Sequence, residues 1–278
     1  MKNLIFRVVT SLILLPLVIS SFLTGGYYFI FLLIIVSLLS AYEVSGMIMP
    51  KSHLGLAVTT LSWAGIFSAI IVGDNFLHSF ALIICALFLA NISFLFIPEI
   101  TKQAYEKLCA IFYVNFYVLC GIGSLFWLRQ GLAESTGIAF IFLACLATWA
   151  NDSCAYFGGR LWGEHKLFES VSAKKTWEGF FSGAIGSLAL IFILDASLRA
   201  YGFEVFSALS TKDLLWVGLP TMILGPLGDL IESRLKRIYD LKDSSNILPG
   251  HGGLLDRIDG LLLVLPWTAL YAFLIRPL

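Results

Sequence analysis

Long apolar runs alternate with short polar segments along the whole chain. A helix that crosses a bilayer needs about 20 mainly apolar residues, and nine segments meet that requirement. Helices also satisfy their own backbone hydrogen bonds in lipid. We therefore predict an all-α, polytopic integral membrane protein with about nine transmembrane helices, at residues 4–23, 27–48, 54–73, 76–97, 108–128, 136–157, 178–200, 213–232 and 255–275.

Composition agrees with a membrane protein. Hydrophobic residues make up 59% of the 278 residues and charged residues 13%, against roughly 25% charged in soluble domains. The formal net charge is zero, and no region has the basic excess of a nucleic-acid-binding protein. We therefore expect the lipid bilayer, and no nucleic acid, as a partner.

Lysine and arginine are distributed unevenly between the two sides of the predicted bundle. With nine spans, the side that holds the N-terminus and the loops after spans two, four, six and eight carries 14 of the 18 Lys and Arg residues. Cytoplasmic loops are enriched in these residues. We therefore expect that side to face the cytoplasm.

Polar residues are concentrated in the second half of the chain. We treat 1–278 as one polytopic protein, with about five helices in 1–135 and two polar motif loops, 151–179 and 229–259, in 136–278. The first half has few charges. Four of its acidic residues stand at span ends, where we expect solvated boundaries: Glu43, Asp74, Glu99 and Glu106.

The end of span eight places three polar side chains on one helix face. Asp229, Ser233 and Lys236 are spaced i, i+4 and i+7, which aligns them on a helix. Lysines at a helix end often extend toward lipid headgroups, but Asp229 lies a turn deeper. A carboxylate in that position is a functional candidate.

The loop that follows carries glycines and a histidine and leads into span nine. Gly252 and Gly253 permit close approach of the backbone to a phosphate, and the N-terminus of span nine would favour an anion. For His251 three roles stay open: binding phosphate, transferring a proton or ordering the loop. Asp256 and Asp259 are three residues apart and are expected on one face of span nine. Together with Asp229 they form an oxygen-ligand set suited to Mg²⁺.

The loop after span six offers a second set of anion-binding groups. Ser172, Lys174, Lys175 and Thr176 are close together in sequence, and such side chains bind phosphate oxygens. A positive-inside anchor is the alternative interpretation of the two lysines. Asp152 stands at the end of span six, where an ionisable residue is a further candidate.

The segment 233–259 resembles the signature of phosphatidate cytidylyltransferases, also called CDP-diglyceride synthetases. The matching positions are Ser233, Lys236-Arg237, Lys242-Asp243, Pro249, His251-Gly252-Gly253, Asp256-Arg257 and Asp259. Asp152, Ala155, Tyr156 and Gly159-Arg160 resemble the family's sixth-span motif, and residues 172–179 resemble its SPKKTWEG element, with Ala173 in place of the usual Pro.

The resemblance implies transfer of the cytidylyl group of CTP to phosphatidate, giving CDP-diacylglycerol and pyrophosphate. It also implies a divalent metal, a multi-pass protein of the bacterial inner membrane with its active site facing the cytoplasm, and a homodimer. The predicted catalytic residues are Asp229, Asp256, Asp259 and Lys236. The three aspartates are the predicted Mg²⁺ ligands, Asp152 is a further candidate, and a second cation is compatible with this set. The predicted substrate-binding residues are Arg160, Ser172, Lys174, Lys175, Thr176, Ser233, Arg237, Lys242, His251, Gly252, Gly253 and Arg257.

Two alternatives remain open from sequence. A CTP-dependent transferase could share the polar motif and act on an ether lipid or a polyprenol. An ion-coupled transporter could use intramembrane carboxylates such as Asp152 and Asp229. Transporters often have repeated halves, whereas the polar groups here are confined to one half.

Overall fold

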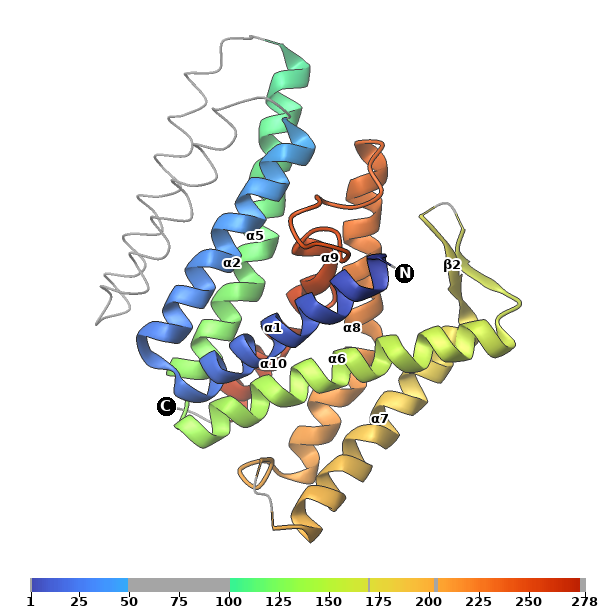
Figure 1. Cartoon of the computed structure of the whole chain (residues 1–278). Helices are drawn as coiled ribbons and strands as arrows, with labels where there is room; N and C mark the ends of the chain where they lie inside the picture. The colour runs from blue at the N-terminus through green and yellow to red at the C-terminus, as the bar shows by residue number, and fades with distance from the viewer. Residues whose placement is uncertain (1, 50–100, 170, 203–204, 276–278) are drawn as a thin grey trace. The chain divides into compact units, whose positions relative to one another are not determined.

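A computed structural model describes residues 2–49, 101–169, 171–202 and 205–275. Helices dominate these residues, which confirms the all-α membrane class (Figure 1). The elements in chain order are α1 (Lys2–Thr24), α2 (Gly26–Ile48), α5 (Lys102–Gln130), α6 (Glu134–Trp162), β1 (Lys166–Phe168), β2 (Ser172–Thr176), α7 (Trp177–Ala200), α8 (Thr211–Ile238), α9 (Leu255–Ile258) and α10 (Leu261–Ile275).

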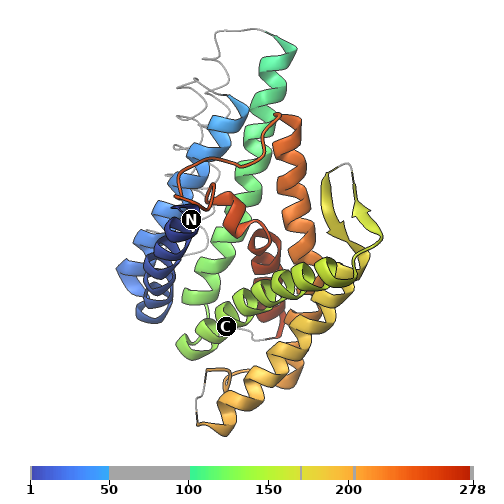
Figure 2. The same cartoon turned by 45° about the vertical axis from the view of Figure 1, so that its right-hand side comes forward.

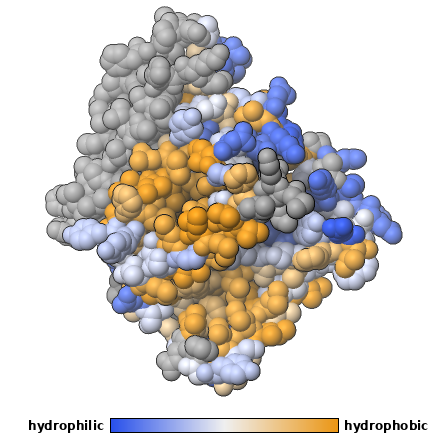
Figure 3. Space-filling model, in the orientation of Figure 1, coloured by the Kyte–Doolittle hydropathy of each residue, from blue (hydrophilic) through white to orange (hydrophobic). Residues whose placement is uncertain are grey.

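Six of the described helices are long and apolar enough to cross a membrane: α1 from Phe6 onward, α2, α5, α6, α7 and α8. Each of them contains one of the predicted spans. Large apolar side chains are exposed on them, such as Leu12 at 68% and Ile185 at 72%, and much of the face drawn in Figure 3 is hydrophobic. The predicted spans 54–73 and 76–97 lie outside the described residues, so the count of nine and the orientation stay predictions.

The predicted ninth span differs from the structure in its first turns. The four-residue helix α9 ends at Ile258, the chain turns at Asp259 and Gly260, and α10 begins at Leu261. A helix of 15 residues rises about 22 Å, less than the hydrocarbon thickness of about 30 Å. The prediction that Asp256 and Asp259 share one face of a continuous helix is therefore wrong. The glycine loop likewise does not lead directly into a long helix.

The described chain forms two compact units that do not follow sequence order. The first comprises Met1–Val18, Gly26–Leu119 and Asp243–Leu255, and the second comprises Ile19–Gly25, Cys120–Lys242 and Asp256–Leu278. The loop after α8 thus belongs to the unit of α2, whereas α8 itself belongs to the other. Two segments that are adjacent in the sequence motif therefore have different packing partners.

In the second unit, α6 packs against α7, α8 and α10 (Figure 2). Small residues permit a close approach between α6 and α7. A Cβ atom on Gly183 would lie 2.8 Å from Asn151 Oδ1, and one on Gly158 would lie 2.2 Å from Ser182 Cβ. Close backbone packing through small residues is the usual way in which helices associate in a membrane.

Polar contacts fasten α8 to α10 in the same unit. Asp213 completes a capping box at the start of α8 and accepts a hydrogen bond from Tyr271 at 3.0 Å. Pro220 has no amide hydrogen to donate to the carbonyl of Trp216. That carbonyl accepts a hydrogen bond from Trp267 Nε1 at 2.8 Å instead. These contacts join the N-terminal part of α8 to α10.

Candidate active site

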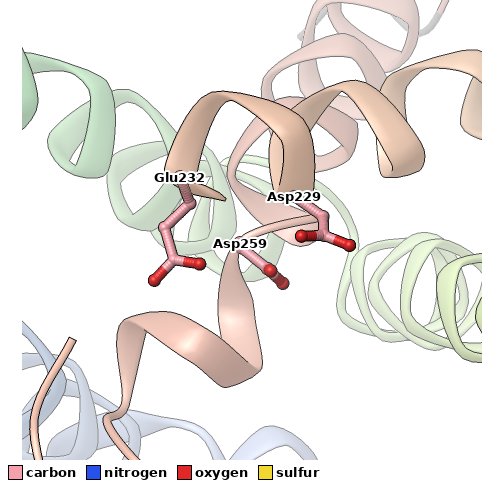
Figure 4. Close-up of side chains that lie close together, drawn as sticks. All are labelled: Asp229, Glu232 and Asp259. Carbon is pink, nitrogen blue, oxygen red and sulfur yellow. The ribbon is translucent and has the colours of Figure 1, made fainter. Parts of the chain in front are cut away.

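Three carboxylates meet where α8 passes the turn between α9 and α10. Asp229 and Glu232 are three residues apart on α8, and Asp259 follows α9 (Figure 4). One oxygen from each residue lies within 4.8 Å of the others. Gly228 makes this approach possible, because a Cβ atom there would lie 2.3 Å from the backbone oxygen of Asp259. We call Asp229, Glu232 and Asp259 the carboxylate cluster.

Two lysines pair with this group of acids. Lys175 Nζ lies 2.8 Å from Asp229 Oδ2 and donates to the carbonyl of Pro226 at 3.1 Å. Lys236 Nζ lies 2.6 Å from Glu232 Oε2 and 2.5 Å from Asp256 Oδ1. Each lysine therefore reaches the acids from a different element, β2 in one case and α8 in the other.

The acids outnumber these lysines. Asp152 lies within electrostatic range of Asp229 and Asp259, so five carboxylates share two ammonium groups. Glu232 Oε1 is buried and has no hydrogen-bond partner among the described residues. A buried carboxylate oxygen without a hydrogen-bond partner is costly. The carboxylate cluster therefore has the composition of a site for a hard cation, which prefers oxygen ligands.

Ser233 and Lys236, the other predicted site residues near Asp229 on α8, both contact members of the cluster. Asp256, unlike Asp229 and Asp259, is not a member of the cluster. Ser233 Oγ donates to Asp229 Oδ1 at 3.0 Å, as the helical spacing predicts. Asp256 lies against Lys236, and Asp152 is not one of the three residues in the cluster. The metal roles of Asp256 and Asp152 stay predictions.

Glu232 is the member of the carboxylate cluster that sequence reasoning missed. It stands three residues after Asp229 and four before Lys236, so the helical periodicity that aligned the other two also places it on this face. Glu232 is not among the site residues predicted from sequence because the signature that the segment resembles begins one residue later, at Ser233.

The hairpin β1–β2 carries the second predicted motif. Its strands are antiparallel, with Lys166 opposite Thr176 and Phe168 opposite Ser172. Thr176 is buried, and its hydroxyl caps α7 by accepting from the amide of Gly179 at 3.2 Å. The hydroxyl predicted to contact substrate thus accepts a helix-capping hydrogen bond. Lys175 is the hairpin residue that reaches the cluster.

Glu178 ties the base of the hairpin to the start of α7. Its carboxylate accepts hydrogen bonds from the backbone amides of Glu164 and His165 at 3.2 Å and lies 2.5 Å from His165 Nδ1. The hydrogen bond to Glu178, followed by its negative charge, raises the pKa of His165 above its usual 6.5. These contacts fix the segment between α6 and β1 to the start of α7, next to the strand β2 that carries Lys175.

The remaining basic residues predicted to bind substrate are exposed in the second unit. Arg160 donates to the hydroxyl of Tyr156 at 3.1 Å, and Arg237 donates to the carbonyl of Leu241 at 3.0 Å. Exposed side chains of this kind can reorient toward a soluble phosphate. The full set of exposed basic candidates is Arg160, Lys174, Arg237, Lys242 and Arg257.

The glycine loop, residues 243–255, belongs to the first unit. Leu248 and Gly252 pair across a tight turn, and Gly252 has the left-handed φ of 85° that this turn requires. His251 Nε2 lies 3.3 Å from Ser11 Oγ. The loop therefore presents His251 from a fixed turn that also contacts α1.

Glu43, which sequence reasoning placed at a solvated boundary, is buried in the first unit at 1% exposure. Its carboxylate accepts hydrogen bonds from residues of the glycine loop. Glu106 is exposed, as predicted, with Lys102 3.6 Å away. Asp74 and Glu99 lie outside the described residues.

The sequence as a whole matches one family model. The model described as the cytidylyltransferase family covers residues 5–275. The chain belongs to the cytidylyltransferase family.

The similar proteins carry a more specific name. The chain is 46% identical over 136 residues to a phosphatidate cytidylyltransferase of Bacillus subtilis, a match that covers 48% of this chain and 47% of that protein. It is 32% identical over 270 residues to the phosphatidate cytidylyltransferase of Staphylococcus haemolyticus and 31% over 266 residues to that of Staphylococcus epidermidis. Each of these two matches covers 94% of this chain and 95% of the relative.

Proposed function

We infer that this protein transfers the cytidylyl group of CTP to phosphatidate and forms CDP-diacylglycerol and pyrophosphate. Family membership and the names of the relatives support this activity. The observation that carries it in the structure is the carboxylate cluster with its two lysines. A reaction between two anions needs such a combination of cation ligands and fixed positive charges.

The reaction is a displacement at the α-phosphorus of CTP. A phosphate oxygen of phosphatidate forms the new bond, and the bond from the α-phosphorus to the oxygen that bridges to the β-phosphorus breaks. Pyrophosphate leaves with that bonding pair. The attacking phosphate is already anionic at neutral pH, so no strong base is required. Catalysis then depends on positioning and charge neutralisation.

The residues of the cluster fit a divalent cation. Asp229, Glu232 and Asp259 would hold Mg²⁺, because their oxygens converge and Glu232 Oε1 has no donor among the described residues. When bound, the ion would neutralise phosphate charge as a Lewis acid. Three carboxylates are also compatible with a second cation.

The lysines and arginines have separable tasks. Lys175 and Lys236, held by Asp229 and by Glu232 with Asp256, are fixed charges for the triphosphate and the departing pyrophosphate. Lys174 and Arg257 are further groups for these phosphates. Arg237 and Lys242 are proposed for the phosphate of the lipid. The two sets can be exchanged without altering the mechanism.

The protein is a multi-pass membrane protein. We propose that it resides in the bacterial inner membrane with the cluster facing the cytoplasm, since CTP is soluble and phosphatidate lies in the leaflet. The bacterial relatives and the distribution of Lys and Arg support this orientation. A homodimer stays a prediction from the family resemblance.

An assay in proteoliposomes tests the proposed function. Purified protein receives radiolabelled CTP with phosphatidate, an ether-lipid phosphate or a polyprenyl phosphate, each with Mg²⁺ or with EDTA. We expect chloroform-soluble label with phosphatidate and Mg²⁺ only. If label enters lipid only with the ether-lipid phosphate or the polyprenyl phosphate, that compound is the lipid substrate. Solute uptake into the proteoliposomes without a labelled lipid product would indicate a transporter.

A further inference from the structure

The first unit contains a carboxylate that the proposed chemistry does not use. Glu43 lies near the end of α2, within an apolar helix, and only 1% of its surface is exposed. A buried ionised carboxylate is costly unless its oxygens accept hydrogen bonds or face a cation. The partners of Glu43 therefore indicate why the residue is there.

Four donors from the glycine loop meet this carboxylate. Oε1 accepts from Ser245 Oγ at 2.6 Å and from the amide of Leu254 at 2.7 Å. Oε2 accepts from Ser244 Oγ at 3.0 Å and from the amide of Leu255 at 2.9 Å. Each oxygen thus binds one hydroxyl and one backbone amide, which is the arrangement suited to an ionised carboxylate.

The close fit depends on Gly253. A Cβ atom at this position would lie 1.8 Å from Ser244 Oγ and 2.8 Å from Glu43 Oε1. Any side chain here would displace the loop from the carboxylate. In this structure the glycine therefore permits the loop to approach α2, in addition to any approach to a phosphate.

The bonds fasten both ends of the loop. Ser244 and Ser245 stand at its start, and Leu254 and Leu255 stand at its end, directly before Asp256 in the sequence. The tip is held separately by α1, where Arg7 donates to the carbonyl of Gly250 at 2.7 Å. His251 is thus carried by a loop whose two ends are joined through a single side chain.

We propose that Glu43 is a positioning residue that clamps the glycine loop in the conformation that presents His251. The proposal rests on the proposed function and on the prediction from sequence that His251, Gly252 and Gly253 contact substrate. Without the clamp, the loop has to be ordered at the expense of substrate binding. The effect is therefore expected mainly in KM, with a smaller change in kcat.

Glu43→Gln tests the clamp with nearly the same shape. Whichever oxygen becomes the amide nitrogen, one backbone amide of Leu254 or Leu255 then faces a donor and loses its acceptor. A serine hydroxyl can rotate, but a backbone amide cannot accept a hydrogen bond. We expect kcat/KM to fall about tenfold to a hundredfold. Glu43→Asp, which keeps the charge, should recover part of that loss.

Hydrogen–deuterium exchange provides a readout that does not depend on activity. Peptides covering 244–255 should exchange at least about tenfold faster in Glu43→Gln, while peptides of α6 and α8 keep the wild-type rate. Glu106→Gln is the matched control, because Glu106 is exposed on α5, and it should change neither exchange nor kinetics. If Glu43→Gln fails to fold, Ser244→Ala, which removes a single donor, takes its place with a smaller effect in the same direction.

The outcomes separate the two proposals. Faster loop exchange together with a raised KM supports the positioning role. Unchanged loop exchange, or faster exchange with unchanged kinetics, overturns it. A wild-type protein without CTP transfer would overturn the proposed function, and exchange in Glu43→Gln would still decide whether the clamp exists.

Discussion

Glu43 and Glu232 are both buried glutamates on long apolar helices, yet their surroundings differ. Each oxygen of the Glu43 carboxylate accepts two hydrogen bonds. Glu232 has one oxygen on Lys236 and another that lacks a partner among the described residues, and it lies beside Asp229 and Asp259. A satisfied carboxylate holds the protein's own chain in place, whereas a carboxylate oxygen without a donor, such as Glu232 Oε1 among the described residues, is available to a ligand. Substitutions in and around the carboxylate cluster test this difference.

Asp259→Asn should have the largest effect. An amide keeps the size of the side chain and removes a negative charge from the carboxylate cluster, so we expect kcat to fall about a thousandfold in a protein that remains folded. CTP incorporation into lipid at saturating Mg²⁺ measures this loss. The control is Asp240→Asn, because Asp240 is exposed and asparagine tolerates its φ of 55°. Wild-type turnover in Asp259→Asn would remove this residue from the site.

Asp256→Asn distinguishes a metal ligand from a partner of Lys236. Because the Asp256 carboxylate lies on Lys236, we expect activity to fall about a hundredfold while the affinity for Mn²⁺ stays close to that of the wild type. Mn²⁺ binding and turnover are measured on the same preparation. Loss of Mn²⁺ binding would instead show that Asp256 is a ligand, as the sequence predicts.

Lys175→Met should have an intermediate effect. It removes the ammonium that pairs with Asp229 and leaves the cluster more negative, so cation binding should be retained while kcat/KM for CTP falls about tenfold to a hundredfold. Lys166→Met is the control from the same hairpin, since Lys166 is exposed on β1. Equal losses in the two variants would mean that the hairpin acts through its general charge.

His165→Gln should have the smallest effect, because the side chain is 75% exposed. The pKa of His165 is raised in the folded protein, so its stabilising contribution is complete below its usual 6.5 and is lost as the pH rises through the folded value. Near pH 5.5 the melting temperature of the variant should be lower than that of the wild type by less than about 2 °C. Near pH 9 the two proteins should melt at the same temperature. A difference that grows with pH would contradict the pairing with Glu178.

Much of the fold could be predicted from hydrophobic periodicity. The ends of the predicted spans lie within about two helical turns of the ends of α1, α2 and α5 to α8. Length and composition suffice here because they decide whether a helix can cross a bilayer. The break at Asp259 and Gly260 could not be found in this way. It depends on how the chain after the loop packs onto Gly228 of α8, which is a tertiary contact.

The candidate site was predicted in part. Asp229 and Asp259 were found because charge in an apolar context is conspicuous, and Lys175 because it lies in a recognisable motif. Glu43 was misplaced because a lone glutamate near a span end is ordinarily solvated. Its donors stand about 200 residues later in the chain, at Ser244 to Leu255, and no local pattern links the two segments.

Binding of Mn²⁺, followed by electron paramagnetic resonance on purified protein without nucleotide or lipid, tests the central claim most directly. We expect a saturable site in the wild type and in Glu43→Gln, and its loss in Asp259→Asn. Equal binding in the wild type and Asp259→Asn, or loss of binding in Glu43→Gln, would contradict the distinction between the carboxylate cluster and the clamp.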